Sequence, residues 1–157
     1  MSTITAVTGL ATCLWFDDQA RHAAEFYTSL LPDSLITGSS PGGPDGEPLV
    51  VEFTLAGVPY TGLNGGPHFT LNEAVSLQVT LPDQATADLL WDTLVAEGEE
   101  SQCGWLKDKY GLSWQVIPDG LVEALSGGTP EENQRATQAM LGMRRLDLAA
   151  IQAARNA

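Results

Sequence analysis

The chain has 157 residues, of which 43% are hydrophobic and 17% are charged. A chain of this size and composition folds around its own core, which excludes a disordered tail and a coiled coil. Its 20 acidic and 7 basic residues give a net charge of −13. This balance excludes nucleic acids and anionic membrane surfaces as partners, because both are bound through Lys and Arg side chains.

The sequence predicts a cytoplasmic protein. No apolar run approaches the roughly 20 residues that cross a bilayer, and residues 1–9 have neither the basic start nor the long apolar stretch of a secretory signal. The two cysteines, Cys13 and Cys103, are too few for a disulfide framework and lack the spacing of a metal site. We therefore expect reduced thiols that serve as small buried apolar side chains.

The first half of the chain predicts a strand, a helix and three further strands. Asp17 and Asp18 follow the first apolar run and are typical helix caps, and Pro32 ends the helical pattern. Residues 41–48 have the composition of a loop. The expected strands cover residues 7–16, 35–39, 49–55 and 58–63.

The second half repeats this order of elements. Asp83 is placed to cap a helix that Gly98 closes, and an apolar strand precedes that helix. We expect the strands of this half over residues 74–81, 99–102, 104–108 and 112–117.

Beyond Pro118 the sequence predicts helices alone, starting with one short turn over residues 121–125. Thr129 to Glu132 form a capping box with proline at the first helical position, and Asp147 is placed to cap a last helix. The apolar stripe of the middle helix includes Met140. We expect these helices to pack on the body of the protein or on a second subunit.

The two faces of the predicted strands differ in character. Each strand turns its apolar side chains toward the helix beside it, and Trp91 and Trp114 are expected to pack a helix on a sheet. The opposite face is mixed, with Trp15 on the first strand, Glu52 on the hairpin and Gln115 on the last strand. Because tryptophan is poorly suited to open water, this pattern indicates a concave sheet that lines a ligand cavity. A plain solvent-exposed face is the alternative.

Three groups of segments carry a family resemblance: 13–17 with 25–27, 63–69 with 72–75, and 100–108 with 111–115. They resemble the PhnB-like branch of the vicinal oxygen chelate superfamily, whose members are often labelled 3-demethylubiquinone 3-methyltransferase. The superfamily includes glyoxalase I, extradiol dioxygenases and bleomycin-resistance proteins.

The resemblance implies an α+β fold in which two βαβββ modules form a cupped mixed sheet, with C-terminal helices added. We expect one domain over residues 1–157, made of a first module (5–66), a second module (72–118) and a helical extension (119–157). The resemblance also implies a homodimer.

The metal enzymes of this superfamily place four ligands on their inner strands. In this sequence the corresponding positions fall on or beside Ala11, between Thr61 and Asn64, on Ala74 or Val75, and on Gln115. Only Gln115 could bind a metal, and a divalent ion needs several converging donors. We therefore expect no metal and no other cofactor.

We expect the cup to bind a small organic molecule, in a protein that could be a metal-independent enzyme of unknown reaction. The alternatives are a metal-dependent enzyme of the glyoxalase or dioxygenase kind and a non-catalytic ligand-sequestering protein of the bleomycin-resistance kind. The candidate acid–base residues are His68 and Glu52, although a backbone-bonded loop histidine and an exposed strand acid are the simpler interpretations. The candidate ligand-binding residues are Cys13, Trp15, Asn64, His68, Phe69, Trp105 and Gln115.

Overall fold

The computed structural model describes residues 4–43 and 46–157, and the chain divides into two compact units, Met1–Leu71 and Asn72–Ala157. Pro44 and Asp45, in the loop predicted over residues 41–48, lie outside the described residues, as do residues 1–3. Among the described helices, none is long and apolar enough to cross a membrane.

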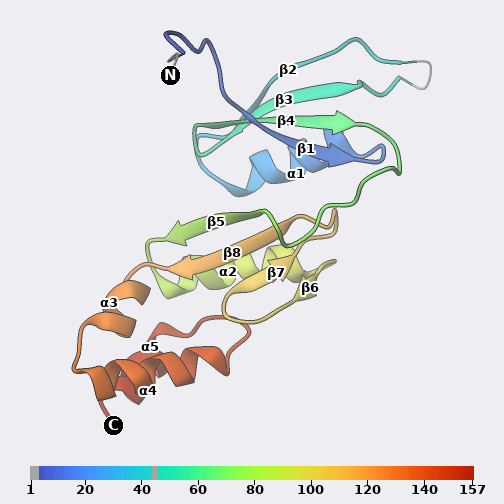
Figure 1. Ribbon diagram of the computed structural model, residues 1–157. Coiled ribbons are helices and arrows are strands. Elements are labelled where there is room, and N and C mark those ends of the chain that lie inside the picture. The colour runs from blue at the N-terminus through green and yellow to red at the C-terminus, as the bar shows by residue number, and fades with distance from the viewer. Residues whose placement is uncertain (1–3, 44–45) are drawn as a thin grey trace. The chain divides into compact units, whose positions relative to one another are not determined.

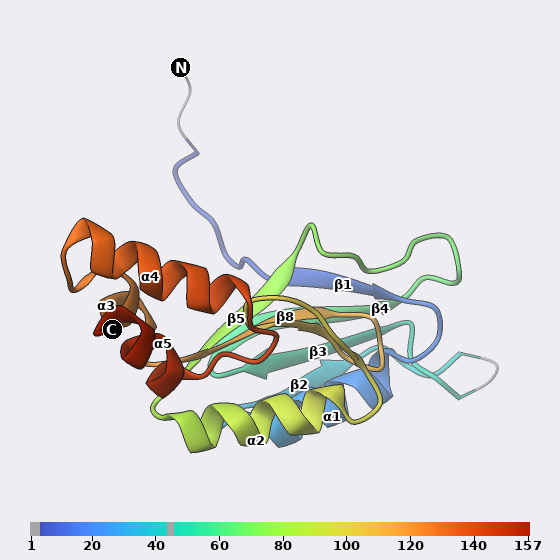
Figure 2. The same ribbon diagram turned by 90° about the horizontal axis from the view of Figure 1, so that it is seen from below.

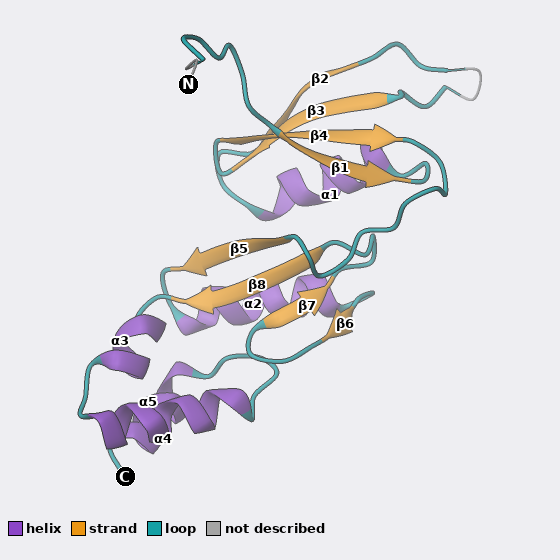
Figure 3. Cartoon of the chain, in the orientation of Figure 1, coloured by secondary structure: helices purple, strands orange, loops and turns teal. Residues whose placement is uncertain are grey.

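The first unit has one helix and a four-stranded sheet (Figures 1 and 3). The strand order is β1-β4-β3-β2, in which β1 runs parallel to β4 and the other neighbours are antiparallel. The elements are β1 (Thr12–Phe16), α1 (Ala20–Leu30), β2 (Leu35–Ser39), β3 (Val50–Leu55) and β4 (Val58–Asn64).

The core of this unit lies between α1 and one face of the sheet. Alternate residues of β1 and β3 are buried there, among them Leu14, Phe16 and Phe53, and they meet the buried Tyr27 of α1. Gly62 of β4 lies under the helix, where a Cβ atom would come 3.2 Å from the Cβ of Ala20. The predicted helix-facing residues of the first strand are therefore confirmed.

Two local predictions for this unit are wrong. The first strand begins at Thr12 rather than at residue 7, because its pairing with β4 begins there, and the side chains of Ile4 and Leu10 are 81% and 85% exposed. The helix begins at Ala20, after Gln19, and neither Asp17 nor Asp18 caps it. Instead the Ala20 amide donates to Asn64 Oδ1 at 2.8 Å.

The second unit repeats the βαβββ order and adds three helices (Figure 1). Its sheet has the order β5-β8-β7-β6, again with one parallel pair, β5 and β8. The elements are β5 (Ser76–Leu81), α2 (Gln84–Val95), β6 (Glu99–Glu100), β7 (Trp105–Lys107), β8 (Ser113–Pro118), α3 (Leu121–Ser126), α4 (Pro130–Leu141) and α5 (Leu148–Arg155). The α+β prediction with two βαβββ modules and C-terminal helices is confirmed.

Helix α2 covers one face of the second sheet. Asp83 caps it as predicted, since its side chain accepts from the Thr86 amide, and this hydrogen bond holds the pKa of the Asp83 carboxyl below its usual range. Trp91 of α2 and Trp114 of β8 are both buried between helix and sheet, as expected. Val75 was expected to face this helix, but it lies one residue before β5 and is exposed.

The three C-terminal helices pack on one another and on the sheet of the second unit (Figure 2). Thr129 and Glu132 form the predicted capping box at α4, and the Asp147 side chain caps α5. The buried centre of this extension is Ala124, Ala136, Leu146 and Ile151, and Ile117 of β8 packs against it. Of the two predicted arrangements, packing on the body of the protein is therefore confirmed.

Candidate functional site

Each sheet has a second face that its own long helix does not cover. Because successive strand residues point to opposite faces, the strand register fixes which side chains share this open face. The first open face carries Cys13, Trp15, Glu52, Thr54, Thr61 and Leu63. The second open face carries Ser76, Gln78, Trp105, Lys107, Ser113 and Gln115.

Trp15, on the first open face, is held in place by several contacts. Its indole Nε1 donates to the Gly66 carbonyl at 2.8 Å, and its ring meets Phe69 edge-on at a centroid distance of 4.9 Å. Its ring also lies directly against Gly65, where any Cβ atom would overlap it. The side chain is half-buried, so one ring surface is held in a fixed position while part of it remains accessible.

The loop after β4 brings Phe69 to this ring, and His68 lies in the same loop with an exposed side chain. Cys13 is exposed on the open face, contrary to the expectation that its thiol is buried. Across the sheet, Thr61 separates Cys13 from Glu52 in one row. The Glu52 carboxylate extends over the neighbouring Gly38, where a Cβ atom would come within 2.8 Å of Oε2.

Asn64 has a structural role in this unit. Its side-chain oxygen accepts from the Ala20 amide, and its side-chain nitrogen donates to the Pro48 carbonyl at 2.9 Å. Asn64 pairs with Phe16 on the helix-covered side of β4. The structure therefore does not bring Asn64 together with the residues of the first open face.

The second open face is organised in rows across the strands. One row is Ser76, Ser113, Lys107 and Glu99, taken from β5 to β6, and the next is Gln78, Gln115 and Trp105. The Gln115 side-chain nitrogen donates to Ser76 Oγ at 2.9 Å, which links the two rows. Gln115 and Trp105, both candidate ligand-binding residues, are therefore neighbours on adjacent strands of this face.

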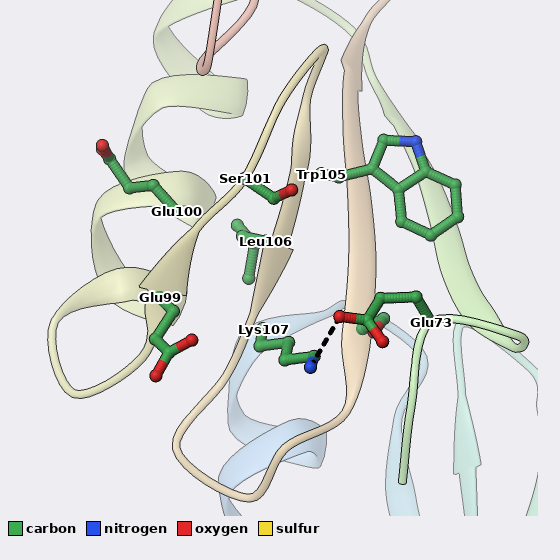
Figure 4. A pocket seen from close by; sticks show the side chains of 8 residues that line it. Glu73, Glu99, Glu100, Ser101, Trp105, Leu106 and Lys107 are labelled. Atoms are coloured by element: carbon green, nitrogen blue, oxygen red, sulfur yellow. Dashed lines mark ion pairs between the residues drawn. The ribbon is translucent and has the colours of Figure 1, made fainter.

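A hollow of about 120 Å³ lies beside the first of these rows (Figure 4). We call it the Ser113 hollow; its lining consists of Glu73, Glu99, Glu100, Ser101, Trp105, Leu106, Lys107 and Ser113. Lys107 Nζ lies 2.6 Å from Glu73 Oε1, and this hydrogen bond lowers the pKa of the Glu73 carboxyl. Among the residues that the structure describes, the hydroxyl of the fully buried Ser113 has no hydrogen-bond partner.

Sequence reasoning placed Ser113 on the correct face but did not select it, Glu73 or Lys107 as site residues. Lys107 carried one available signal, since it is one of only seven basic residues in the chain. The burial of Ser113 could not be predicted, because it depends on what covers this part of the sheet.

A second hollow, of about 390 Å³, lies at the other end of the second open face. Gln78, Thr80 and Ile117 form its sheet side, and Leu121 and Val122 of α3 form another wall. The C-terminal extension therefore shapes one end of this face.

The residues present do not suit the metal that the superfamily resemblance implies. Over residues 4–43 and 46–157, no three His, Cys, Asp or Glu side chains are grouped so that they could hold a metal ion. Gln115 is the one possible donor among the expected ligand positions, and a single side-chain oxygen does not make a metal site. We therefore derive no chemistry through a metal.

Comparison with known proteins places this architecture in a family. The sequence matches the 3-demethylubiquinone-9 3-methyltransferase family over residues 8–117, whereas the comparison with curated proteins finds no match. The PhnB protein of Bacillus cereus is 31% identical, with a TM-score of 0.64, and the match covers 69% of this chain and 98% of that protein.

Two more distant structures share the fold. A Pseudomonas aeruginosa protein is 14% identical, with a TM-score of 0.60 and coverage of 71% of this chain and 98% of that one. The fosfomycin resistance protein FosX of Listeria monocytogenes is 15% identical, with a TM-score of 0.54, and the match covers 77% of this chain and 99% of FosX. The chain belongs to the 3-demethylubiquinone-9 3-methyltransferase family, the PhnB-like branch of the vicinal oxygen chelate superfamily.

Proposed function

We propose that this protein binds a small organic molecule on the open faces of its sheets. The observation that carries the proposal is the Trp15 indole, which Gly66 and Phe69 hold in place while part of it remains exposed. Sites for small molecules combine such apolar walls with a few placed polar groups. The second open face supplies such groups in the Gln115 amide and the Lys107 ammonium.

The proposed ligand-binding residues are Cys13, Trp15, Phe69, Trp105 and Gln115, with His68 at the edge. Asn64 is left out, because both polar ends of its side chain already bond within the chain. Glu52 and His68 remain the candidates for proton transfer if the bound molecule also reacts. Glu52 is exposed on the first open face, where its carboxylate could accept a proton from a bound molecule.

Methyl transfer is not part of the proposal. A nucleotide-type cofactor is commonly held by a glycine-rich loop that links a strand to the following helix. Here residues 41–46 lie between β2 and β3, and residues 65–66 lie between β4 and β5. Membership of a family also does not fix the reaction, since related sites on one fold carry different chemistry.

A metal-dependent reaction is the second candidate, because one structure of FosX is described with Mn(II) and a dihydroxypropylphosphonic acid. Elemental analysis of tag-free protein separates the two candidates. The proposal predicts no stoichiometric zinc, iron, nickel or manganese. A metal that is lost together with thermal stability on chelation would favour the second candidate.

The ligand proposal is tested with two variants. A compound found by library screening is titrated against Trp15→Ala and Gln115→Leu, with circular dichroism as the fold control. Loss of the indole contact area is expected to weaken binding by about 1–3 kcal/mol, which is roughly 5- to 150-fold in Kd. Gln115→Leu keeps the bulk but loses the amide, so compounds with a polar group there are expected to lose about 0.5–1.5 kcal/mol.

Leu89→Ala is the matched control, because Leu89 is an exposed apolar residue of α2, outside both open faces. It is expected to bind the compound like the wild-type protein. If Trp15→Ala and Gln115→Leu fold and also bind like the wild-type protein, the open faces are not the binding site.

The proposal includes a homodimer, which the family resemblance supports. Exposed apolar side chains of the described residues, among them Leu49, Val58 and Val75, offer surface that a second copy could cover. Sedimentation velocity at micromolar concentrations is expected to give the mass of two chains. The mass of one chain across that range would reject the dimer and leave the ligand proposal standing.

A further inference from the structure

One residue of the Ser113 hollow has a hydroxyl that forms no hydrogen bond with another described residue. Ser113 is fully buried, and its Oγ has no hydrogen-bond partner among the described residues. Buried polar groups in native proteins are nearly always hydrogen-bonded, so an exception calls for an explanation. Because Ser113 is one of the residues that line the hollow, a ligand that enters this space and reaches the hydroxyl could provide the missing partner.

The direct neighbour of Ser113 on β7 is Lys107, on the same open face. Its ammonium group is bound by the Glu73 carboxylate at 2.6 Å, and Figure 4 shows these two side chains meeting across the hollow. This ion pair shows that the space in front of Lys107 accepts a carboxylate. The neighbouring Ser113 hydroxyl, however, forms no hydrogen bond with any residue that the structure describes.

Among the described residues, neither of the other two acidic side chains of the hollow forms an ion pair with Lys107. The Glu100 carboxylate has other partners, since it accepts a hydrogen bond from Trp91 Nε1 at 3.3 Å and forms an ion pair with Arg144 at 3.2 Å. Glu99 lies opposite Lys107 on β6, and no ion pair joins it to another described residue. In Figure 4 it lies on the side of Lys107 away from Glu73.

We infer that Lys107 and Ser113 bind the carboxylate group of a small organic acid, and that Glu73 occupies this place when the ligand is absent. The inference rests on the proposed function, because it names the kind of group that the second open face holds. A ligand carboxylate that bonds both Lys107 and Ser113 makes one hydrogen bond more than Glu73 does. A hollow of about 120 Å³ suits a molecule of a few non-hydrogen atoms or the acidic end of a larger one.

Glu73 can be displaced at small cost. It lies three residues before β5, its side chain is 62% exposed, and surface ion pairs contribute little to stability. While the Glu73 carboxylate is bound to Lys107, it competes with an external carboxylate for the same ammonium group. The apparent affinity for the external carboxylate is therefore reduced in proportion to the fraction of molecules in which Glu73 occupies Lys107. Removing the Glu73 charge should therefore strengthen binding.

The test is a titration of the full-length protein with sodium propionate, followed by amide NMR shifts at residues 107 and 113. Glu73→Gln is expected to lower the Kd at least threefold relative to the wild-type protein. Lys107→Met is expected to abolish saturable shifts, and Ser113→Ala to raise the Kd at least threefold. Glu131→Gln, an exposed acid of α4, is the matched control and should change nothing.

Ser113→Ala also distinguishes a binding role from a structural one. Because it removes a buried hydroxyl without a partner, its melting temperature should equal or exceed that of the wild-type protein. A lower melting temperature with unchanged Kd would show that Ser113 serves the fold and would overturn the inference.

Two further results would also overturn the inference. One is the absence of saturable propionate shifts in Glu73→Gln, and the other is binding of n-propylammonium chloride at the same residues with equal Kd. If either occurs while Trp15→Ala and Gln115→Leu still weaken a screened compound, the inference fails and the proposed function stands. If propionate binds as expected and those two variants have no effect, the wider site is wrong while the Lys107 and Ser113 site remains.

Discussion

Removal of residues 129–157 is expected to abolish the cooperative unfolding of the second unit. The deletion takes away Leu146 and Ile151, both buried in the centre of the extension. Loss of one such side chain costs about 2–5 kcal/mol, whereas whole domains are stable by only about 5–15 kcal/mol. Loss of two approaches the total stability of the domain.

The extension also completes the β6–β7 connection. The amides of Cys103 and Gly104 donate to the carbonyls of Met143 and Arg144 at 2.9 and 2.7 Å. Leu146 lies so close to Gly104 that a Cβ atom there would come within 2.9 Å of Leu146 Cδ1. Deletion would leave both amides without these partners, next to the strand that carries Lys107.

Thermal unfolding followed by near-ultraviolet circular dichroism checks this prediction. The family match ends at residue 117, and 69% of this chain is enough to cover 98% of the B. cereus PhnB protein. The extension could therefore be thought dispensable. A truncated protein that melts cooperatively within a few degrees of the wild-type protein would contradict our prediction. Removal of Asn156 and Ala157 alone is the control and should have no effect.

Asp108→Ala is expected to destabilise the protein by about 2–6 kcal/mol, because it leaves two buried donors unsatisfied at about 1–3 kcal/mol each. Asp108 is buried between β7 and β8. Its Oδ2 accepts from Trp114 Nε1 at 2.8 Å, and its Oδ1 accepts from the amides of Tyr110 and Leu112 at 2.8 and 3.1 Å. Trp114 and Leu112 are themselves buried.

Urea unfolding of three variants checks this prediction. Asp108→Asn keeps one acceptor oxygen, so its loss of stability should lie between those of the wild-type protein and Asp108→Ala. Asp92→Ala is the matched control, because the ion pair that Asp92 makes with Arg145 is exposed, and such pairs are worth about 0–1 kcal/mol. An Asp108→Ala variant no less stable than Asp92→Ala would contradict the proposed network.

Features that depend on neighbours in the sequence were predictable. The caps at Asp83, Thr129 and Asp147 each act on an amide three residues ahead, so the local sequence contains the whole interaction. The cap of α1 was not predictable, because its acceptor is Asn64, 44 residues away. Residues 7–11 likewise have strand-like composition, but a strand forms only where a partner strand pairs with it.

The candidate site also has features that the local sequence predicts and features that it does not. Alternation along the strands correctly assigned Trp15, Ser113 and Gln115 to faces away from the helices, because that assignment needs only the period of a strand. It could not show that Trp15 is held by a loop about 50 residues later, or that the buried Ser113 hydroxyl has no partner within residues 4–43 and 46–157. Both facts depend on packing between segments that are distant in sequence.

The most direct test of ligand binding at the open faces is a map of amide and side-chain NMR shifts on addition of a screened ligand. Our account predicts that the largest shifts occur at the Trp15 indole, the Gln115 side-chain amide and the strand residues beside them. Helix-covered positions such as Tyr27 and Trp91 should change little. Saturable shifts confined to the outer surfaces of α1, α2 or α4, with none on either open face, would contradict the account.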